Sequence, residues 1–191
     1  ALATTLYYDQ FYLPQGSKMF IWNADRTQVI GAFTEFNNHE SGVFATELIY
    51  GETCFIEYTE PASQAGNGLI SISDIGYAYR YIELEEDERG GASCEVDINC
   101  SEGTNWQNQK KGVVRMQVVD NSGAGWCSAS VVNNTSLNCV PYVLSAFHCG
   151  DGSTTSNFNQ YIFYFNYERT GCGTGTSSTS SSMTGCAKKA D

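Results

Sequence analysis

The chain has 191 residues, a length that fits one large domain or two small ones. It carries 21 Asp and Glu against 10 Lys and Arg, a formal net charge of -11. This balance argues against capture of nucleic acid or of an anionic membrane, because both need a basic surface. No apolar run approaches the roughly 20 residues of a membrane helix, so we expect no membrane span. No charged-then-apolar leader opens the sequence, so we expect a mature or excised product.

The charge divides the sequence into two parts. Residues 1–90 hold 14 acids and 4 bases, whereas residues 91–191 hold 7 acids and 6 bases. At the junction, the acidic run 83–88 leads into a glycine pair at 90–91. Like charges repel and glycine adds no stiffness, so this segment predicts an interdomain linker, with a solvated loop inside one domain as the alternative. We predict a first domain over 1–84, a linker over 85–91 and a second domain over 92–191.

The first part reads as a series of short strands separated by turn clusters rich in Gly, Pro, Asn and Asp. Alternation is clearest in Ile70-Ser71-Ile72-Ser73, the period of a half-buried strand. Evenly spaced strands with compact turns predict an antiparallel β-sandwich. The expected strands cover 5–13, 18–23, 28–36, 43–50, 53–59 and 69–79.

The second part is also predicted to be β, so the whole chain is assigned to the all-β class. Val114, Met116 and Val118 should face a core, while Arg115 and Gln117 face water. The aromatic run 161–165 predicts a strand covered on both sides. The Gly-, Ser- and Thr-rich tract 173–185 predicts a long exposed loop, with an O-glycosylated loop as the alternative.

The cysteines indicate an oxidising compartment. There are eight, an even count, and no two form a C-x-x-C pair. The only histidines, His39 and His148, stand in no zinc-binding frame, so we expect neither a metal nor another cofactor. Dispersed cysteines in a Gly- and Ser-rich chain favour disulfides and therefore an extracellular address.

One segment could carry chemistry. A strand containing Cys127 is followed by a second strand that ends at His148-Cys149. A bridge from Cys127 to Cys149 would pin this hairpin and hold the imidazole at its end. A general base for a serine nucleophile requires such fixation, because proton abstraction tolerates little positional error.

Four segments in order carry a likeness to a known family: 93–103 (SCEVDINCSEG), 131–135 (VVNNT), 142–150 (YVLSAFHCG) and 163–168 (FYFNYE). Together they resemble secreted bacterial trypsin-fold serine proteases of the lysyl endopeptidase type, from the start of the mature protease domain onward. The likeness covers about residues 92–191. More loosely, the first part is similar to the β-rich region that precedes the protease in such precursors.

The resemblance implies roles for particular residues. His148 would be the triad base, with the Cys127–Cys149 bridge beside it. Cys100 would pair with Cys172 and tie the domain start to the strand that ends near Glu168. We also predict a third pair, Cys139 with Cys186. The whole would be a sandwich followed by a partial trypsin-like β-barrel.

Other catalytic parts of the family are missing from the sequence. The family's triad Asp lies in a later segment resembling Ser-Asp-Phe, which does not occur before Asp191, and no Gly-x-Ser-Gly nucleophile motif is present. Asp191 is unanchored, and Ser145 belongs to a strand. Cys94 resembles a cysteine whose partner lies in the absent second barrel. We therefore predict no peptidase activity for the chain as it stands.

Two functions follow. The first is the N-terminal portion of a secreted serine endopeptidase precursor, with polypeptide substrates once it is completed. The alternative is a non-catalytic extracellular protein that self-assembles into a fibre through exposed β-strand edges. The expected partners are accordingly the missing C-terminal protease half or further copies of the chain.

Overall fold

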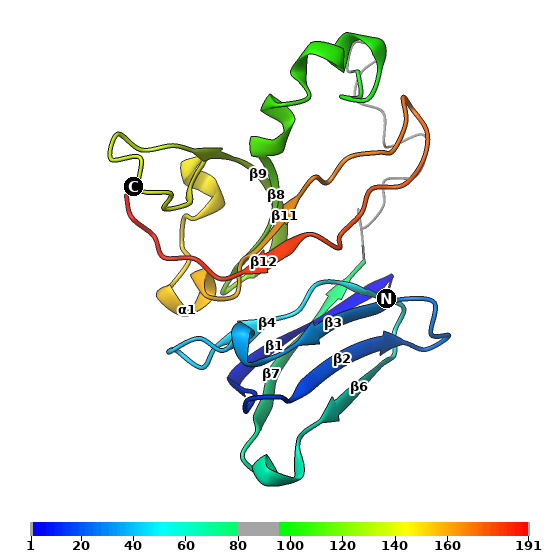
Figure 1. Cartoon of the computed structure of the whole chain (residues 1–191), viewed down its shortest axis with the longest axis vertical. Helices are drawn as coiled ribbons and strands as arrows, with labels where there is room; N and C mark the ends of the chain where they lie inside the picture. Colours follow the sequence, from blue (N-terminus) through cyan, green and yellow to red (C-terminus); the bar gives the residue numbers. More distant parts are fainter. Residues whose placement is uncertain (1, 80–95, 191) are drawn as a thin grey trace. The chain divides into compact units, whose positions relative to one another are not determined.

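A computed structural model of the chain describes residues 2–79 and 96–190. These residues form two compact units. The first comprises 2–79 with the short segments 154–160 and 184–187, and the second comprises 96–153, 161–183 and 188–190. Both units are built from antiparallel strands, so the prediction of an all-β fold is confirmed (Figure 1). The predicted linker at 85–91 and its flanking boundaries lie outside the described residues.

The first unit contains two antiparallel sheets. In one, β1 is central: β4 and β5 pair with it, and so does β7, from Ala3↔Ala78 to Tyr12↔Leu69 with shifts of register on both sides of Tyr8. In the other, β2 lies between β3 and β6 (Figure 1). The strands are β1 (Ala3–Tyr12), β2 (Lys18–Asn23), β3 (Val29–Phe33), β4 (Phe44–Ala45), β5 (Ile49–Tyr50), β6 (Cys54–Thr59) and β7 (Leu69–Ala78), with short 3-10 turns η1 (Glu35–Asn37) and η2 (Ala62–Gln64).

Apolar side chains from both sheets meet in one core. Tyr8, Phe11 and Phe44 of the first sheet form a buried aromatic cluster, in which the rings of Phe11 and Phe44 stack at 4.2 Å between centroids. Met19 and Ile21 of the second sheet pack into the same core and are fully buried. Two sheets that share one apolar core form a sandwich, as the strand spacing predicted.

Two predicted strands are shorter than expected. The strand predicted over 28–36 ends at Phe33, because Thr34 caps the turn η1 and exchanges hydrogen bonds with Asn37. The strand predicted over 43–50 is split into β4 and β5 at Thr46, whose hydroxyl accepts a hydrogen bond from the Leu6 N–H at 3.2 Å. In both places a threonine hydroxyl takes a backbone hydrogen bond, as threonine side chains commonly do at turns and caps.

The second unit is built on one five-stranded antiparallel sheet with the order β10-β9-β8-β11-β12. Figure 1 labels β9, β8, β11 and β12 of this sheet. Within the described residues the sheet is open rather than closed into a barrel. Its strands are β8 (Val113–Asp120), β9 (Gly123–Val132), β10 (Tyr142–Ser145), β11 (Ile162–Phe165) and β12 (Ser182–Thr184). The connecting segments hold η3 (Ser101–Trp106), η4 (Gln109–Gly112) and η5 (Phe147–Cys149). The single-turn helix α1 (Thr155–Phe158) lies in one of the short segments that belong to the first unit. No described helix is long and apolar enough to cross a membrane.

The faces of β8 differ from the prediction. Val114 and Met116 are buried as expected, but Gln117 is buried too, and its amide oxygen accepts a hydrogen bond from the Tyr164 hydroxyl at 3.1 Å. Arg115 is half-buried against aromatic rings instead of extending into water. Alternation marks the two sides of a strand, but it does not show whether aromatic residues from elsewhere cover the second side. Residues 161–164 are buried, as predicted for a doubly covered strand.

The Gly/Ser/Thr tract is only partly a loop. It contains β12, and Ser177 forms an isolated antiparallel bridge with Arg169. The backbone N–H of Phe165 donates to the Ser181 carbonyl at 2.8 Å. Small side chains favour loops, but a strand at a sheet edge needs only its backbone to pair, so composition alone misses it.

Two phenylalanines in the first unit allow a matched test of the core. Phe44 is buried among three aromatic rings, whereas Phe36 is 91% exposed. Phe44→Ala should lower the free energy of unfolding by about 3–5 kcal/mol, because it removes buried apolar surface and leaves a cavity. Phe36→Ala should change it by less than about 0.5 kcal/mol. Urea unfolding followed by circular dichroism measures both, and similar losses for the two variants would contradict the sandwich core.

Candidate active site

The hairpin of β9 and β10 places His148. The two strands pair antiparallel from Tyr142↔Val132 to Ser145↔Ala129. The turn η5 follows β10 directly, closed by a hydrogen bond from the Cys149 N–H to the Ala146 carbonyl at 3.0 Å. A disulfide joins Cys149 to Cys127 on β9, with 6.1 Å between the Cα atoms. The histidine is therefore held between an edge strand and a covalent anchor to the neighbouring strand.

A buried tyrosine also holds the backbone next to this histidine. The hydroxyl of Tyr161, a fully buried residue, donates to the Cys149 carbonyl at 2.8 Å and lies 2.7 Å from the Ser153 hydroxyl. His148 itself is exposed and borders a recess of about 280 Å³ whose lining includes Asp120 and Asp151. The main chain of the turn is fixed, and the imidazole is accessible to a reacting group.

The described residues supply no carboxylate partner for this imidazole. His148 forms no hydrogen bond or ion pair with any residue in the described ranges. The Asp120 carboxylate accepts three hydrogen bonds in its own turn, from the Ser122 hydroxyl at 2.6 Å, the Ser122 N–H at 2.7 Å and the Gly123 N–H at 3.0 Å. These bonds, with that from the Ser122 side chain strongest, hold the pKa of Asp120 below its usual range. Asp120 thus stabilises the β8–β9 turn.

Neither a serine nucleophile nor a metal centre is assembled beside His148 within the described parts of the chain. The Ser145 hydroxyl donates to the Ser128 carbonyl at 2.8 Å and so joins the two strands of the hairpin. The ligand atoms of Cys127, His148 and Cys149 lie within 4.8 Å of one another, but the two sulfurs are bonded to each other. Only a thiolate ligates a metal, so the oxidised pair cannot hold one. Asp191 lies outside the described residues.

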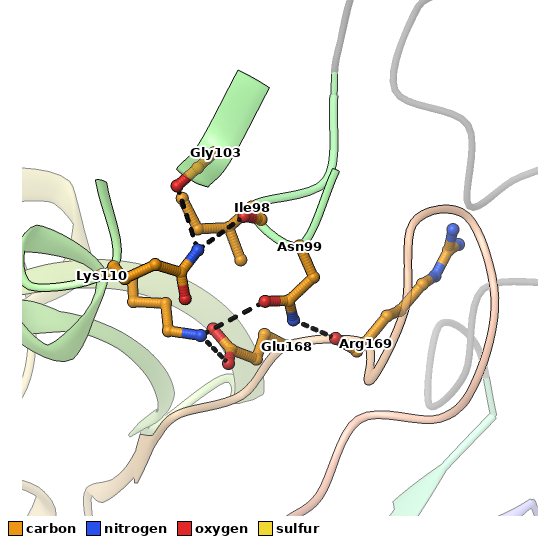
Figure 2. Close-up of polar contacts among 7 residues, drawn as sticks. Ile98, Asn99, Gly103, Lys110, Glu168 and Arg169 are labelled. Carbon is orange, nitrogen blue, oxygen red and sulfur yellow. Dashed lines mark hydrogen bonds and ion pairs between the residues drawn. The ribbon is translucent and has the colours of Figure 1, made fainter. Parts of the chain in front are cut away.

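A polar cluster fixes the start of the second unit. The Lys110 ammonium lies 2.6 Å from a Glu168 carboxylate oxygen and donates to the Asn99 amide oxygen at 3.3 Å (Figure 2). The Asn99 amide in turn donates to the Arg169 carbonyl at 2.6 Å, and the Arg169 guanidinium pairs with Asp97 at 3.3 Å. These groups come from segments about 60 to 70 residues apart in the sequence, so no local pattern could have indicated them.

A disulfide between Cys100 and Cys172 joins the same two segments, as the resemblance implied. The covalent bond and the ion pairs act together here. An exposed ion pair contributes little to stability, but a partly buried network beside a disulfide loses less side-chain entropy when it forms. The start of this unit is thereby fastened to the chain that follows β11.

The predicted third disulfide is wrong, because Cys139 and Cys186 are both free thiols. Cys139 is exposed in the connection between β9 and β10. The half-buried Cys186 thiol instead donates to the Phe158 carbonyl at 3.6 Å. Cys54 is also free, and Cys94 lies outside the described residues.

Thiol labelling tests this cysteine assignment. With disulfides intact, iodoacetamide at pH 8 should modify the exposed Cys139 rapidly and Cys186 slowly. The thiolate is the reacting form, and burial raises the pKa of Cys186 to about 11, so its labelling rate should keep rising as the pH approaches 11. Peptide mapping by mass spectrometry gives both rates. Equal rates at the two sites, or labelling of Cys127 without prior reduction, would contradict the structure.

A comparison with known protein families accounts for this arrangement. The model of the family described as "Lysyl endopeptidase, C-terminal domain" matches residues 90–191, which is more than half of the chain. The match contains the β9–β10 hairpin, His148 and both disulfides. The chain therefore belongs to the lysyl endopeptidase C-terminal domain family and is a serine endopeptidase-related protein.

Proposed function

We propose that this chain is the N-terminal portion of a secreted serine endopeptidase precursor, with His148 as the base that would activate a serine. The placement of His148 carries the proposal. The imidazole stands at the end of a disulfide-anchored hairpin, with its backbone fixed by Tyr161 and its ring exposed. A general base must be held within hydrogen-bond reach of the hydroxyl proton that it removes, and this position favours that role.

As it stands, the chain is proposed to be inactive. Acyl transfer needs a nucleophile, a base oriented by an acid, and donors that stabilise the oxyanion. Of these, the described residues offer the base, and the sequence contains no Gly-x-Ser-Gly segment. Polypeptides would become substrates when a C-terminal protease half supplies the remaining groups. That half is the first of the two proposed partners.

The first unit is proposed to be an accessory domain of the precursor. Its apolar core is built from its own strands. Its residues, with the linker, also hold most of the negative charge, since 1–90 carry 14 acids against 4 bases. An acidic domain with an apolar core of its own suits a soluble pro-region better than a substrate-binding subdomain. The proposed extracellular location is supported by the two disulfides, which persist in oxidising compartments.

The proposed inactivity can be measured directly. The purified chain should hydrolyse neither lysyl nor arginyl esters, and a fluorophosphonate probe should label none of its serines. The physical reason is that no serine hydroxyl is paired with His148 among the described residues. Trypsin treated with the same probe serves as the positive control. Stoichiometric labelling of any serine, lost on His148→Ala, would show that the chain is a working hydrolase.

The precursor proposal has its own test, the intact mass of the polypeptide in its native source. A mass well above the 20.9 kDa of this chain supports a precursor with a further protease half. A mass near 20.9 kDa, with no second chain attached, contradicts it. This measurement does not depend on the activity assay, so failure of one leaves the other interpretable.

A second candidate function rests on the free edge of the five-stranded sheet. Among the described strands, β10 ends the sheet order, and its Leu144 is 65% exposed. Phe147, just beyond the strand, is also largely exposed. An apolar edge strand is a template for pairing with another chain, and head-to-tail pairing need not close. We therefore propose as the alternative a non-catalytic extracellular protein that assembles into a fibre.

Sedimentation with two matched variants tests this alternative. The unmodified chain should sediment as species larger than a monomer, and Leu144→Lys should shift it to the monomer, because a charge on an edge strand blocks strand addition. Leu137→Lys is the control, since Leu137 is 71% exposed but lies in the connection between β9 and β10. A monodisperse monomer at every concentration would exclude the fibre.

A further inference from the structure

A groove in the second unit is separate from the recess at His148. Its volume is about 600 Å³, and its lining is mainly apolar and aromatic, with Trp106, Trp126 and Tyr167 among its residues. The charged groups in the lining are Lys110, Arg115 and Glu168. His148 does not line this groove. Cys127, whose disulfide anchors the His148 turn, does.

Arg115 lies between two aromatic rings of this groove. Its guanidinium carbon is 3.6 Å from the centroid of the Trp126 ring and 4.3 Å from that of the Tyr167 ring. Each of the two rings also pairs with Tyr164. The guanidinium is therefore packed against two aromatic rings of the groove.

The charge of Arg115 is uncompensated. Across the described residues, Arg115 has no hydrogen-bond or ion-pair partner, although its side chain is half-buried. The other cation of the groove, Lys110, is neutralised by Glu168 at 2.6 Å. The aromatic rings offset part of the hydration that the half-buried guanidinium has lost, but they accept no in-plane hydrogen bond from it, so an anionic acceptor that enters the groove is favoured.

The chemistry of the missing acceptor follows from the guanidinium. A stacked arginine keeps its in-plane donors free, and their fork matches the two oxygens of a carboxylate. Residues 96–190, which include the groove, carry five acids and six bases, so the net charge of this part does not oppose such a ligand.

We propose that this groove binds an Asp or Glu side chain of an extended polypeptide, with the carboxylate on Arg115 and the neighbouring apolar residues against Trp106 and Trp126. We assign the occupant to a side chain within a polypeptide because a groove of about 600 Å³ with a mainly apolar lining has room for apolar neighbours beside the carboxylate. The proposed contacts involve binding and no catalytic step. The proposal therefore holds whether or not the chain is a peptidase precursor.

Fluorescence titration of the whole chain tests the proposal. The probe is the amidated peptide N-acetyl-Gly-Leu-Glu-Leu-Gly-amide, and the readout is tryptophan emission, since two of the three tryptophans line the groove. The Glu peptide should bind saturably, and its Gln counterpart should bind at least about tenfold more weakly, because a charge-assisted bidentate contact is lost. A third peptide, with Gln and a free C-terminal carboxylate, distinguishes the two sources of a carboxylate.

Three variants locate the binding. Arg115→Gln should weaken binding of the Glu peptide by about tenfold or more, and Arg115→Lys should weaken it by less, because the charge remains without the fork. Lys111→Gln removes the same charge from an exposed neighbour that does not line the groove, and it should leave binding unchanged. Far-UV circular dichroism verifies that each variant is folded, and Arg115→Lys serves if Arg115→Gln is not.

Each contrary result overturns the proposal. Equal binding of the Glu and Gln peptides would show that the carboxylate is not recognised. An equal loss in Lys111→Gln would show only a general charge attraction, and tighter binding of the free C-terminal carboxylate would assign the groove to chain termini. The absence of saturable binding of the Glu peptide up to about 5 mM would exclude a useful site.

Discussion

The bond between Cys127 and Cys149 is the constraint on which the geometry around His148 depends. The turn that carries the histidine has three residues, and the strand before it has four and lies at the sheet edge. Neither element would be stable alone. The disulfide connects them to β9, which pairs with β8 from Val113↔Ser130 to Asp120↔Gly123. The disulfide thereby fixes the short exposed turn to the β8–β9 hairpin, and the hydrogen bond from the Tyr161 hydroxyl fixes it further.

The two units are stabilised in different ways. The first has a cluster of nine buried residues, of which eight lie on five strands of both sheets and the ninth, Leu13, directly follows β1. In the second unit, two disulfides and the polar cluster around Lys110 join segments that are far apart in the sequence. Closing a long loop with a disulfide removes entropy from the unfolded chain, by about 3 kcal/mol or more for loops of this size. The sheet can therefore leave side chains such as Leu144 exposed and remain folded.

Some parts of this protein could be predicted from local patterns in the sequence. Alternation and turn residues were sufficient for the all-β class and for most strands of the first unit, because these signals lie within a few residues of one another. The hairpin with His148 was predicted for the same reason. The burial of Arg115 and Gln117 was not predicted, because the residues that contact them, Tyr164 and Tyr167, lie some 50 residues later in the sequence. The pairing of Cys139 with Cys186 failed because an even number of cysteines does not show which of them pair.

The central position of β1 has a consequence for synthesis of the chain. This strand is synthesised well before its partners: β4 begins at Phe44, and β7 completes the pairing at Ala78. At a translation rate of roughly 5–20 residues per second, β1 remains without its last partner strand for several seconds. Contacts of such sequence separation also fold slowly, because loop closure must precede them. During elongation the edges of β1 are therefore unpaired, and binding of a chaperone at this stage would prevent non-native strand pairing.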